Sequence, residues 1–141
     1  MEELPACEFG FPGPLRDKLV AAVLAGVKTA GTGLLEEYRR DESPVEEVGR
    51  RELVVDSDGR GVAIVETVEV EVKRMGDVDR QFAIDEGEGF ETVDDWYAAH
   101  VRFFTSPGMV AALGDPPVTI DDDTLVVCSR FRVIEQLHAP G

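Results

Sequence analysis

The sequence GVAIVETVEVEV at residues 61–72 decides the fold class, because apolar and polar residues alternate along most of it. This period of two is typical of a β-strand, whose side chains point alternately to opposite faces of a sheet. The preceding segment ELVVD at residues 52–56 is also rich in strand formers, and the turn sequence SDGR separates the two. Together they predict a β-hairpin.

The even positions of the longer strand are expected to form its apolar face, and a carboxylate, Glu66, interrupts that face. A carboxylate in apolar surroundings needs a partner. Lys28 or Arg130 is the expected partner, which makes Glu66 a candidate site residue. The apolar members of this face are Val62, Ile64, Val68, Val70 and Val72.

Helical patterns flank this hairpin. Residues 14–26, PLRDKLVAAVLAG, begin with proline and end with glycine around an apolar stripe, which predicts an amphipathic helix. Residues 27–33 are irregular and are predicted to be a loop, and residues 34–40 are predicted to form a short helix. Thr92 and Asp95 fit a capping box, after which aromatic residues and a histidine recur at helical spacing: Trp96, Tyr97, His100, Phe103 and Phe104.

The segment TLVVCSRFRVIE at residues 124–135 is predicted to be a long final strand. Helices are thus interspersed with strands, and the strands are joined by hairpins rather than arranged in regular βαβ units. We expect an α+β fold with a mainly antiparallel, partly closed sheet. A length of 141 residues fits one domain, residues 1–141, with its core at about residues 9–135.

The charge balance limits the partners. The chain has 29 acidic and 14 basic residues, a net charge of −15. Such a surface repels phosphate backbones and loses the counterion release that drives non-specific nucleic-acid binding. Long DNA or RNA is therefore not expected as a tight partner, whereas a local basic pocket can admit a nucleotide or a short single strand.

Other classes of protein are also disfavoured. No apolar run approaches the roughly 20 residues of a membrane span, and the first residues, MEELPACEFG, lack the pattern of a secretion signal. A cytoplasmic location is expected. Cys7 and Cys128 form neither a CxxC motif nor a disulfide framework, and Cys128 is expected to be a buried apolar residue. With two histidines in the chain, a zinc site is not expected.

Five segments, in this order, resemble the ASCH domain family of the PUA-like superfamily. They are AGVKTAGTGLLEEY (25–38), IVETVEVEV (64–72), FAIDEGEG (82–89), WYAAHVRFF (96–104) and VVCSRFRV (126–133). The resemblance implies a PUA-like partly closed β-barrel with helices around it and a cleft near the glycine-X-lysine loop. Members of the family have been associated with RNA binding, with RNA cleavage and with removal of the acetyl group from acetylated cytidine.

The resemblance also implies site residues. Gly26 and Lys28 match the family's glycine-X-lysine motif, and Glu86 or Glu88 lies at its acidic position. The hydrolase-type pattern has a threonine three residues after the lysine. Gly31 stands there in this chain, between Thr29 and Thr32. Either the loop is shifted by one residue or the nucleophile is absent. The candidate substrate-binding residues are Gly26, Thr29, Gly31, Tyr38, Ser129 and Arg130.

Two kinds of hydrolysis fit these residues. In an amidohydrolase acting on acetylcytidine, Thr32 or Thr29 attacks, a desolvated Lys28 takes the threonine proton and a glutamate positions the amine. In a ribonuclease acting on short single-stranded RNA, which is the first hypothesis, Lys28 meets the phosphate. Glu66, Glu86 or Glu88 then acts as the base or binds magnesium or manganese, so a divalent cation is expected only in this case.

Each candidate also has a purely structural interpretation. Lys28 follows a helix end, where a solvated cation is favoured, and threonines are common in turns. The aromatic helix face is expected to be core, with His100 packed and hydrogen-bonded within it. In the final strand Ser129 and Phe131 share one face, opposite Arg130 and Arg132, so only one of these pairs can point into a cleft. A module that binds RNA or a nucleotide without turnover remains the non-enzymatic alternative.

Overall fold

The computed structural model describes residues 4–38, 43–113 and 119–137. Its strands are β1 (Ala6–Cys7), β2 (Ala30–Leu34), β3 (Arg51–Val55), β4 (Gly61–Arg74) and β5 (Leu125–Gln136), and its α-helices are α1 (Pro14–Leu24), α2 (Arg80–Asp85), α3 (Val93–Phe104) and α4 (Pro107–Leu113). Three short 3-10 helices lie at Leu35–Glu37, Pro44–Glu47 and Met75–Asp77.

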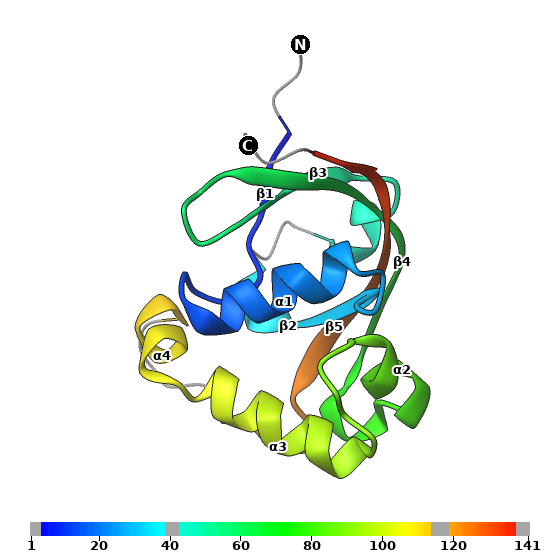
Figure 1. The fold of residues 1–141 in the computed structure, drawn as a ribbon. Coiled ribbons are helices and arrows are strands. Elements are labelled where there is room, and N and C mark those ends of the chain that lie inside the picture. Colours follow the sequence, from blue (N-terminus) through cyan, green and yellow to red (C-terminus); the bar gives the residue numbers. More distant parts are fainter. Residues whose placement is uncertain (1–3, 39–42, 114–118, 138–141) are drawn as a thin grey trace.

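The strands form one sheet in the order β1-β3-β4-β5-β2, which Figure 1 shows as strongly curled. The pair β1–β3 is parallel and the other three pairs are antiparallel. The long strands β4 and β5 lie at the centre. Shifts of register between Ile64 and Val65 and between Thr67 and Glu69 interrupt their pairing. Such irregularities increase the local bend and twist of a sheet. The expected α+β, PUA-like, partly closed sheet with helices around it is confirmed.

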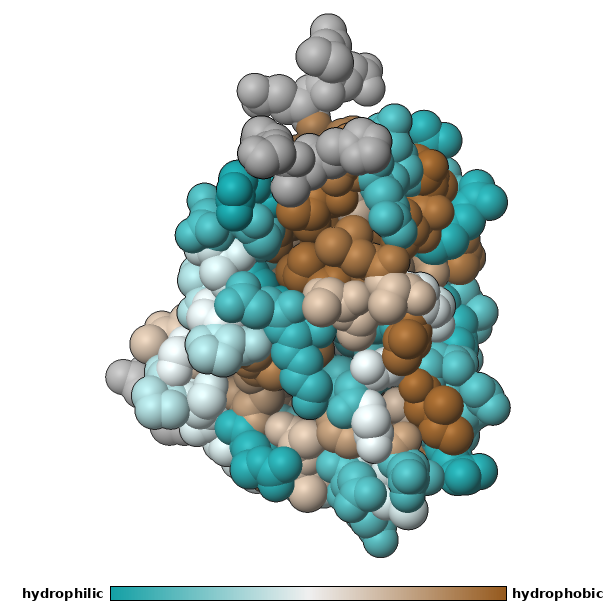
Figure 2. Space-filling model, in the orientation of Figure 1, coloured by the Kyte–Doolittle hydropathy of each residue, from teal (hydrophilic) through white to brown (hydrophobic). Residues whose placement is uncertain are grey.

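Two apolar clusters form the core. Helix α1 packs its Val20 and Val23 against Val54, Val65 and Phe131 of the sheet. The second cluster joins α2, α3 and α4 to β2 and β5; its largest fully buried side chain is that of Trp96. In Figure 1, α2 and α3 lie at one end of the molecule and α1 lies between them and the β1–β3 edge. Figure 2, from the same side, shows an apolar area surrounded by hydrophilic residues.

The predicted hairpin, the helix at residues 93–104 and the final strand are confirmed, with Thr92 Oγ1 accepting a hydrogen bond from Asp95 N at 3.1 Å. The predicted loop at residues 27–33 is wrong, since Ala30–Leu34 is strand β2, paired with β5. Gly31 and Gly33 interrupt the alternation of apolar and polar residues that would have indicated a strand. The predicted helix at residues 34–40 is only the 3-10 turn Leu35–Glu37, and residues 39–40 lie outside the described residues.

The prediction of which face of β4 is buried was also wrong, and in the second half of the strand Val68 and Val72 are 46% and 36% exposed. Ala63, Val65 and Thr67 point into the core, whereas Glu66 lies on the opposite face. In the first half of the strand both sets of positions contain apolar residues, Val62 and Ile64 on one face and Ala63 and Val65 on the other, so the sequence pattern alone does not separate them. Glu66 is therefore not a carboxylate on a buried apolar face.

No helix in the described residues is long and apolar enough to cross a membrane.

Candidate functional site

Lys28 is a buried lysine, with 2% of its surface exposed. Helix α1 ends before it, Gly26 turns the chain with a φ of 77°, and the Lys28 N–H donates to Ala22 O at 3.1 Å. Its Nζ donates to Ala30 O at 2.8 Å, to Glu86 O at 3.2 Å and to Glu88 Oε2 at 3.5 Å. A lysine ammonium has three protons, so each has an acceptor in this arrangement.

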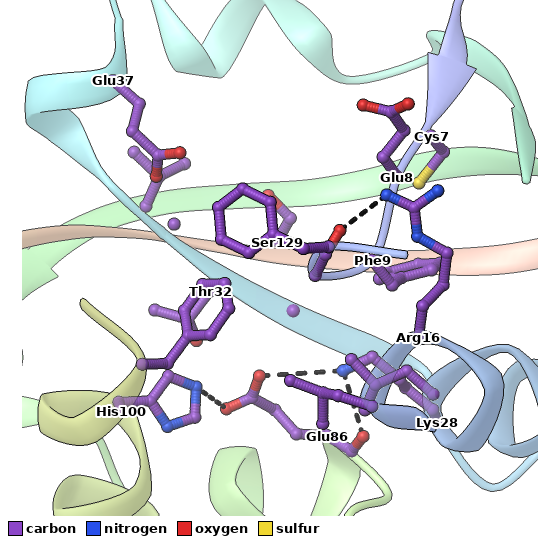
Figure 3. Close-up of a pocket in the computed structure, with 18 of the residues that line it drawn as sticks. Cys7, Glu8, Phe9, Arg16, Lys28, Thr32, Glu37, Glu86, His100 and Ser129 are labelled. Atoms are coloured by element: carbon purple, nitrogen blue, oxygen red, sulfur yellow. Dashed lines mark hydrogen bonds and ion pairs between the residues drawn. The ribbon is translucent and has the colours of Figure 1, made fainter. Parts of the chain in front are cut away.

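Glu86 is the buried carboxylate at the centre of the site, with 1% of its surface exposed. It directly follows α2. Its Oε2 accepts a hydrogen bond from Trp96 Nε1 and lies 3.1 Å from His100 Nε2, and its Oε1 lies 3.8 Å from Lys28 Nζ. Figure 3 shows this carboxylate between His100 of α3 and Lys28. Buried carboxylates require such partners.

His100 connects this carboxylate to the backbone of its own helix. Its Nδ1 lies 2.8 Å from Trp96 O, and its ring stacks on that of Trp96 at 4.3 Å between centroids. Both ring nitrogens therefore face an acceptor. A neutral imidazole has only one N–H, so the arrangement requires either an imidazolium beside a carboxylate or a neutral pair with the proton on Glu86.

The pKa shifts favour the charged pair. Burial opposes the charge of Glu86, but the hydrogen bond and charge of His100 and the charge of Lys28 outweigh it, so the pKa of Glu86 lies below its usual 4.5. Burial likewise opposes the charge of His100, but the hydrogen bond to Glu86 and its negative charge raise the pKa of His100 above 6.5. Together with the acceptors that face both ring nitrogens, these directions favour an imidazolium beside a carboxylate.

Gly87 allows the loop after α2 to approach Lys28. Its φ is 70°, and a Cβ at this position would lie 2.5 Å from Lys28 Cα and 2.6 Å from Lys28 N. Only glycine fits such a close approach of two backbones. Gly87 thus allows Glu86 and Glu88, on either side of it, to reach the same lysine.

These groups line a cavity of about 1020 Å³ between α1, α3 and the sheet. The Thr32 hydroxyl, on β2, also belongs to its wall, and this buried oxygen has no hydrogen-bond partner among the described residues. The pKa of the Cys7 thiol is raised to about 12, and burial is the largest cause. This residue of the cavity wall therefore remains protonated. Six glutamates line the cavity, which has four lysine or arginine residues and His100 in the same wall. The glutamates are Glu8, Glu37, Glu47, Glu52, Glu86 and Glu88, and the lysine and arginines are Arg16, Lys28, Arg50 and Arg102.

The structure brings most of the predicted site residues together. Those that line the cavity are Lys28, Gly31, Thr32, Tyr38, Glu86, Glu88 and Ser129. Phe131 lies in the wall beside Ser129, whereas Arg130 and Arg132 make ion pairs elsewhere, so the predicted division of β5 into two faces is confirmed.

Four predicted residues lie outside the cavity wall. Gly26 shapes the turn before Lys28, and the Thr29 N–H donates to Asp85 O at 2.9 Å. The expected partners of Glu66 are corrected: Glu66 pairs with Arg132 at 2.7 Å and Arg51 at 3.3 Å, on the outer face of β4. Arg130 pairs with Asp85 at 2.6 Å.

Three residues of the site were not predicted from the sequence. His100 and Arg16 line the cavity, and Trp96 supports Glu86. The prediction that His100 is packed and hydrogen-bonded is confirmed, but its role as the partner of Glu86 was not foreseen. The only signal was its place on the aromatic helix face. Arg16 is 4% exposed, and nothing in the pattern of its helix indicated that an arginine would be buried.

A divalent cation does not fit this cluster as it is arranged. Glu86, Glu88 and His100 each offer one ligand atom, and these atoms lie within 4.8 Å of one another. However, Lys28 Nζ lies 3.8 and 3.5 Å from the two carboxylates, and His100 Nε2 is bonded to Glu86. Metal binding would require the ammonium to leave and His100 to lose its proton.

The curled, mainly antiparallel sheet with helices around it belongs to the class of PUA-like α+β domains. The family model of the ASCH domain matches residues 6–135. The chain therefore belongs to the ASCH domain family.

Two solved structures are similar to this chain. Protein EF3133 from Enterococcus faecalis V583, assigned to the family DUF984, is 27% identical with a TM-score of 0.79; the match covers 100% of this chain and 86% of that one. The ASCH domain from Lactobacillus crispatus JV V101 is also 27% identical, with a TM-score of 0.78, over 92% of this chain and 79% of that one. No curated protein matches.

The close approach at Gly87 predicts a large effect of substitution. Gly87→Ala is expected to lower the free energy of unfolding by clearly more than the roughly 1–2 kcal/mol that a left-handed conformation costs a residue with a side chain, because the Lys28 backbone must also move. Gly89→Ala is the matched control, since Gly89 has a φ of 89° but no atom within 4 Å of the added Cβ. Urea unfolding measures both. Equal losses of unfolding free energy in Gly87→Ala and Gly89→Ala would contradict the explanation from close packing at Gly87.

The charged pair predicts a pH dependence of stability. Because the folded-state pKa of His100 is raised, its contribution is fully present below 6.5 and is lost as pH rises through the folded pKa. The lowered pKa of Glu86 has the opposite effect: the contribution of Glu86 to stability is lost as pH falls below 4.5. The difference in unfolding free energy between wild type and His100→Asn should therefore shrink from pH 6 toward pH 9. A difference that stays constant over this range would mean that His100 is neutral in the folded protein.

Proposed function

We propose that this chain is an amidohydrolase that removes the acetyl group from a small acylated cytidine. The observation that carries the proposal is the wall of the cavity, where a buried lysine has two glutamate neighbours. The same wall contains a buried threonine hydroxyl that has no hydrogen-bond partner among the described residues. An unsatisfied buried hydroxyl requires an explanation, and a substrate carbonyl or acyl group would provide its missing partner.

Charge supports this hypothesis over RNA cleavage. The positive charge of Lys28 is already balanced by the carboxylates of Glu86 and Glu88, so it attracts a phosphate group only weakly. The surrounding wall contains more glutamates than basic residues, and the whole chain has a net charge of −15. A neutral amide experiences little repulsion in these surroundings, whereas an RNA backbone would experience strong repulsion.

The size of the cavity supports the same conclusion. Its volume of about 1020 Å³ lies at the upper end of the roughly 300–1,000 Å³ typical of small-molecule sites. Aromatic side chains in the wall, including Phe9 and Phe131 with ring centroids 5.8 Å apart, offer an apolar surface to a base. A nucleoside fits this description better than a polynucleotide strand.

The proposed reaction uses three side chains. Lys28 first gives one proton to Glu88, 3.5 Å away, and becomes a neutral amine. Thr32 Oγ1 then attacks the acetyl carbon while its proton passes to this amine. The tetrahedral intermediate collapses, the C–N bond breaks, and the leaving amine takes the proton back from Glu88. Water then hydrolyses the acetyl-threonine ester to acetate and restores the hydroxyl. Glu86 and His100 keep Lys28 in place as positioning residues.

Turnover of acetylcytidine tests this function. Wild type is expected to release acetate without added metal, and Lys28→Ala and Thr32→Val should each reduce kcat/KM by about 100-fold or more. Glu66→Gln is the control, because its carboxylate pairs with arginines outside the cavity, and its turnover should match that of wild type. Full activity of Thr32→Val would remove the threonine from the mechanism.

The same preparations separate the alternatives. Cleavage of a short single-stranded RNA that requires manganese, with no release of acetate, would favour the ribonuclease. Binding of either substrate without conversion would favour a non-catalytic binding module.

A further inference from the structure

Arg16 is a buried cation that the proposed reaction does not use. It is the third residue of α1 and only 4% exposed, and it lines the same cavity as Lys28. Its guanidinium donates to Gly10 O at 2.7 Å and to Asp56 O at 3.5 Å, and its buried Nε has no partner among the described residues. Both of its acceptors are neutral carbonyl groups.

Arg16 therefore differs from Lys28 in its charge balance. Within the described part of the chain, no carboxylate lies within 4.0 Å of its guanidinium nitrogens, whereas Lys28 has two. Glu8 also lines the cavity and lies near Arg16 in Figure 3, but the two form no ion pair. Buried charges in proteins are generally paired. The missing counter-ion of Arg16 thus indicates that a ligand supplies it.

The start of α1 supports the same interpretation independently. The N-cap residue is Gly13, which has no side chain to accept hydrogen bonds from the first N–H groups, and no side-chain cap is present. Residues of this turn, including Leu15 and Arg16, line the cavity. Free N–H groups and the helix dipole make such an end favourable for an anion. Asp17, the acidic residue of this turn, accepts a hydrogen bond from Ser57 Oγ at 2.7 Å.

The two ends of the cavity are thus electrostatically different. In Figure 3 the guanidinium of Arg16 points away from the group formed by Lys28, Glu86 and His100. At the Lys28 end the cation is neutralised, which suits a neutral amide. At the Arg16 end the guanidinium has no carboxylate within 4.0 Å among the described residues, and the helix N-terminus has no side-chain cap. This arrangement suits a group with oxygen acceptors in a fork, such as phosphate or carboxylate.

We propose that Arg16 and the first turn of α1 bind an oxyanion of the substrate, so that the preferred substrate is an acylated nucleotide monophosphate rather than the uncharged nucleoside. This inference rests on the proposed amidohydrolase function. The acetyl group lies at Lys28 and Thr32, and the phosphate lies at Arg16. A single phosphate is accommodated there, whereas the acidic wall and surface still disfavour a longer strand.

Equilibrium binding tests this substrate class. The probes are acetylcytidine, its 5′-monophosphate, inorganic phosphate and acetate, each measured by calorimetry with wild type, Arg16→Gln and Arg16→Lys. Wild type should bind the monophosphate at least about tenfold more tightly than the nucleoside, since hydrogen bonds to charged groups are the stronger kind. Arg16→Gln should lose this preference and Arg16→Lys should retain part of it. Arg102→Gln, which changes an exposed arginine of the same wall, should retain all of it.

Several results would overturn the inference. Equal affinity of wild type for nucleoside and monophosphate would do so, and so would an unchanged preference in Arg16→Gln. Tighter binding of acetate than of inorganic phosphate would assign the site to a carboxylate-bearing ligand instead of a nucleotide. If Arg16→Gln fails to fold, Arg16→Lys and competition between inorganic phosphate and the monophosphate on wild type provide the test.

Failure of this inference and failure of the proposed function give different results. Deacetylation of the nucleoside with no gain from the phosphate would retain the amidohydrolase and remove the anion site. Arg16-dependent binding of the monophosphate without release of acetate would retain the anion site and remove the amidohydrolase.

Discussion

The burial of the Glu86 carboxylate is the constraint on which the rest of this site depends. Burial of an ion is costly unless donors surround it, and here the donors come from distant parts of the chain. Trp96 and His100 come from α3, and Lys28 follows α1. Satisfying one carboxylate therefore fixes the position of α3 relative to the loop after α2 and draws the end of α1 toward both. Gly87 makes this geometry possible because the backbones of residues 87 and 28 come closer than a side chain would permit.

The same constraint divides the cavity electrostatically. Glu86 and Glu88 neutralise Lys28, and the charge of His100 is balanced by the same buried carboxylate. Within the part of the chain that the structure describes, Arg16 has only carbonyl partners. One end of the cavity can therefore hold a neutral reacting group and the other an anion, although the whole chain is strongly acidic. Net charge alone describes the long-range repulsion of polyanions and not these local preferences.

Much of the fold could be predicted from the sequence because its longest elements have strong periodicity. The hairpin, the aromatic helix and the final strand are such elements. Strand β2 was missed because Gly31 and Gly33 leave no pattern, and its conformation depends on pairing with β5. Helix α4 was missed because Pro107 and Gly108 resemble breakers, although proline is favoured in the first turn of a helix.

The candidate site was predictable only where residues followed a motif. Lys28, Glu86 and Glu88 were found in this way, and the structure brings them together. The role of Glu66 was misjudged because the first half of β4 has apolar residues on both faces, so the pattern did not reveal which face is buried. The contacts of His100 and Arg16 depend on tertiary packing between segments far apart in the sequence, and no local pattern specifies them.

The neutral end of the cavity depends on a charged pair of Glu86 and His100 inside the protein. Nitrogen NMR of the imidazole ring tests this most directly, with the signals of His100 assigned by their absence from the spectrum of His100→Asn. At about pH 6.5, the usual pKa of histidine, a free imidazole is half protonated, whereas both ring nitrogens of His100 should give mainly the shifts of protonated nitrogens. A ring with one unprotonated nitrogen at this pH would contradict the account, because Lys28 would then be held by a neutral pair.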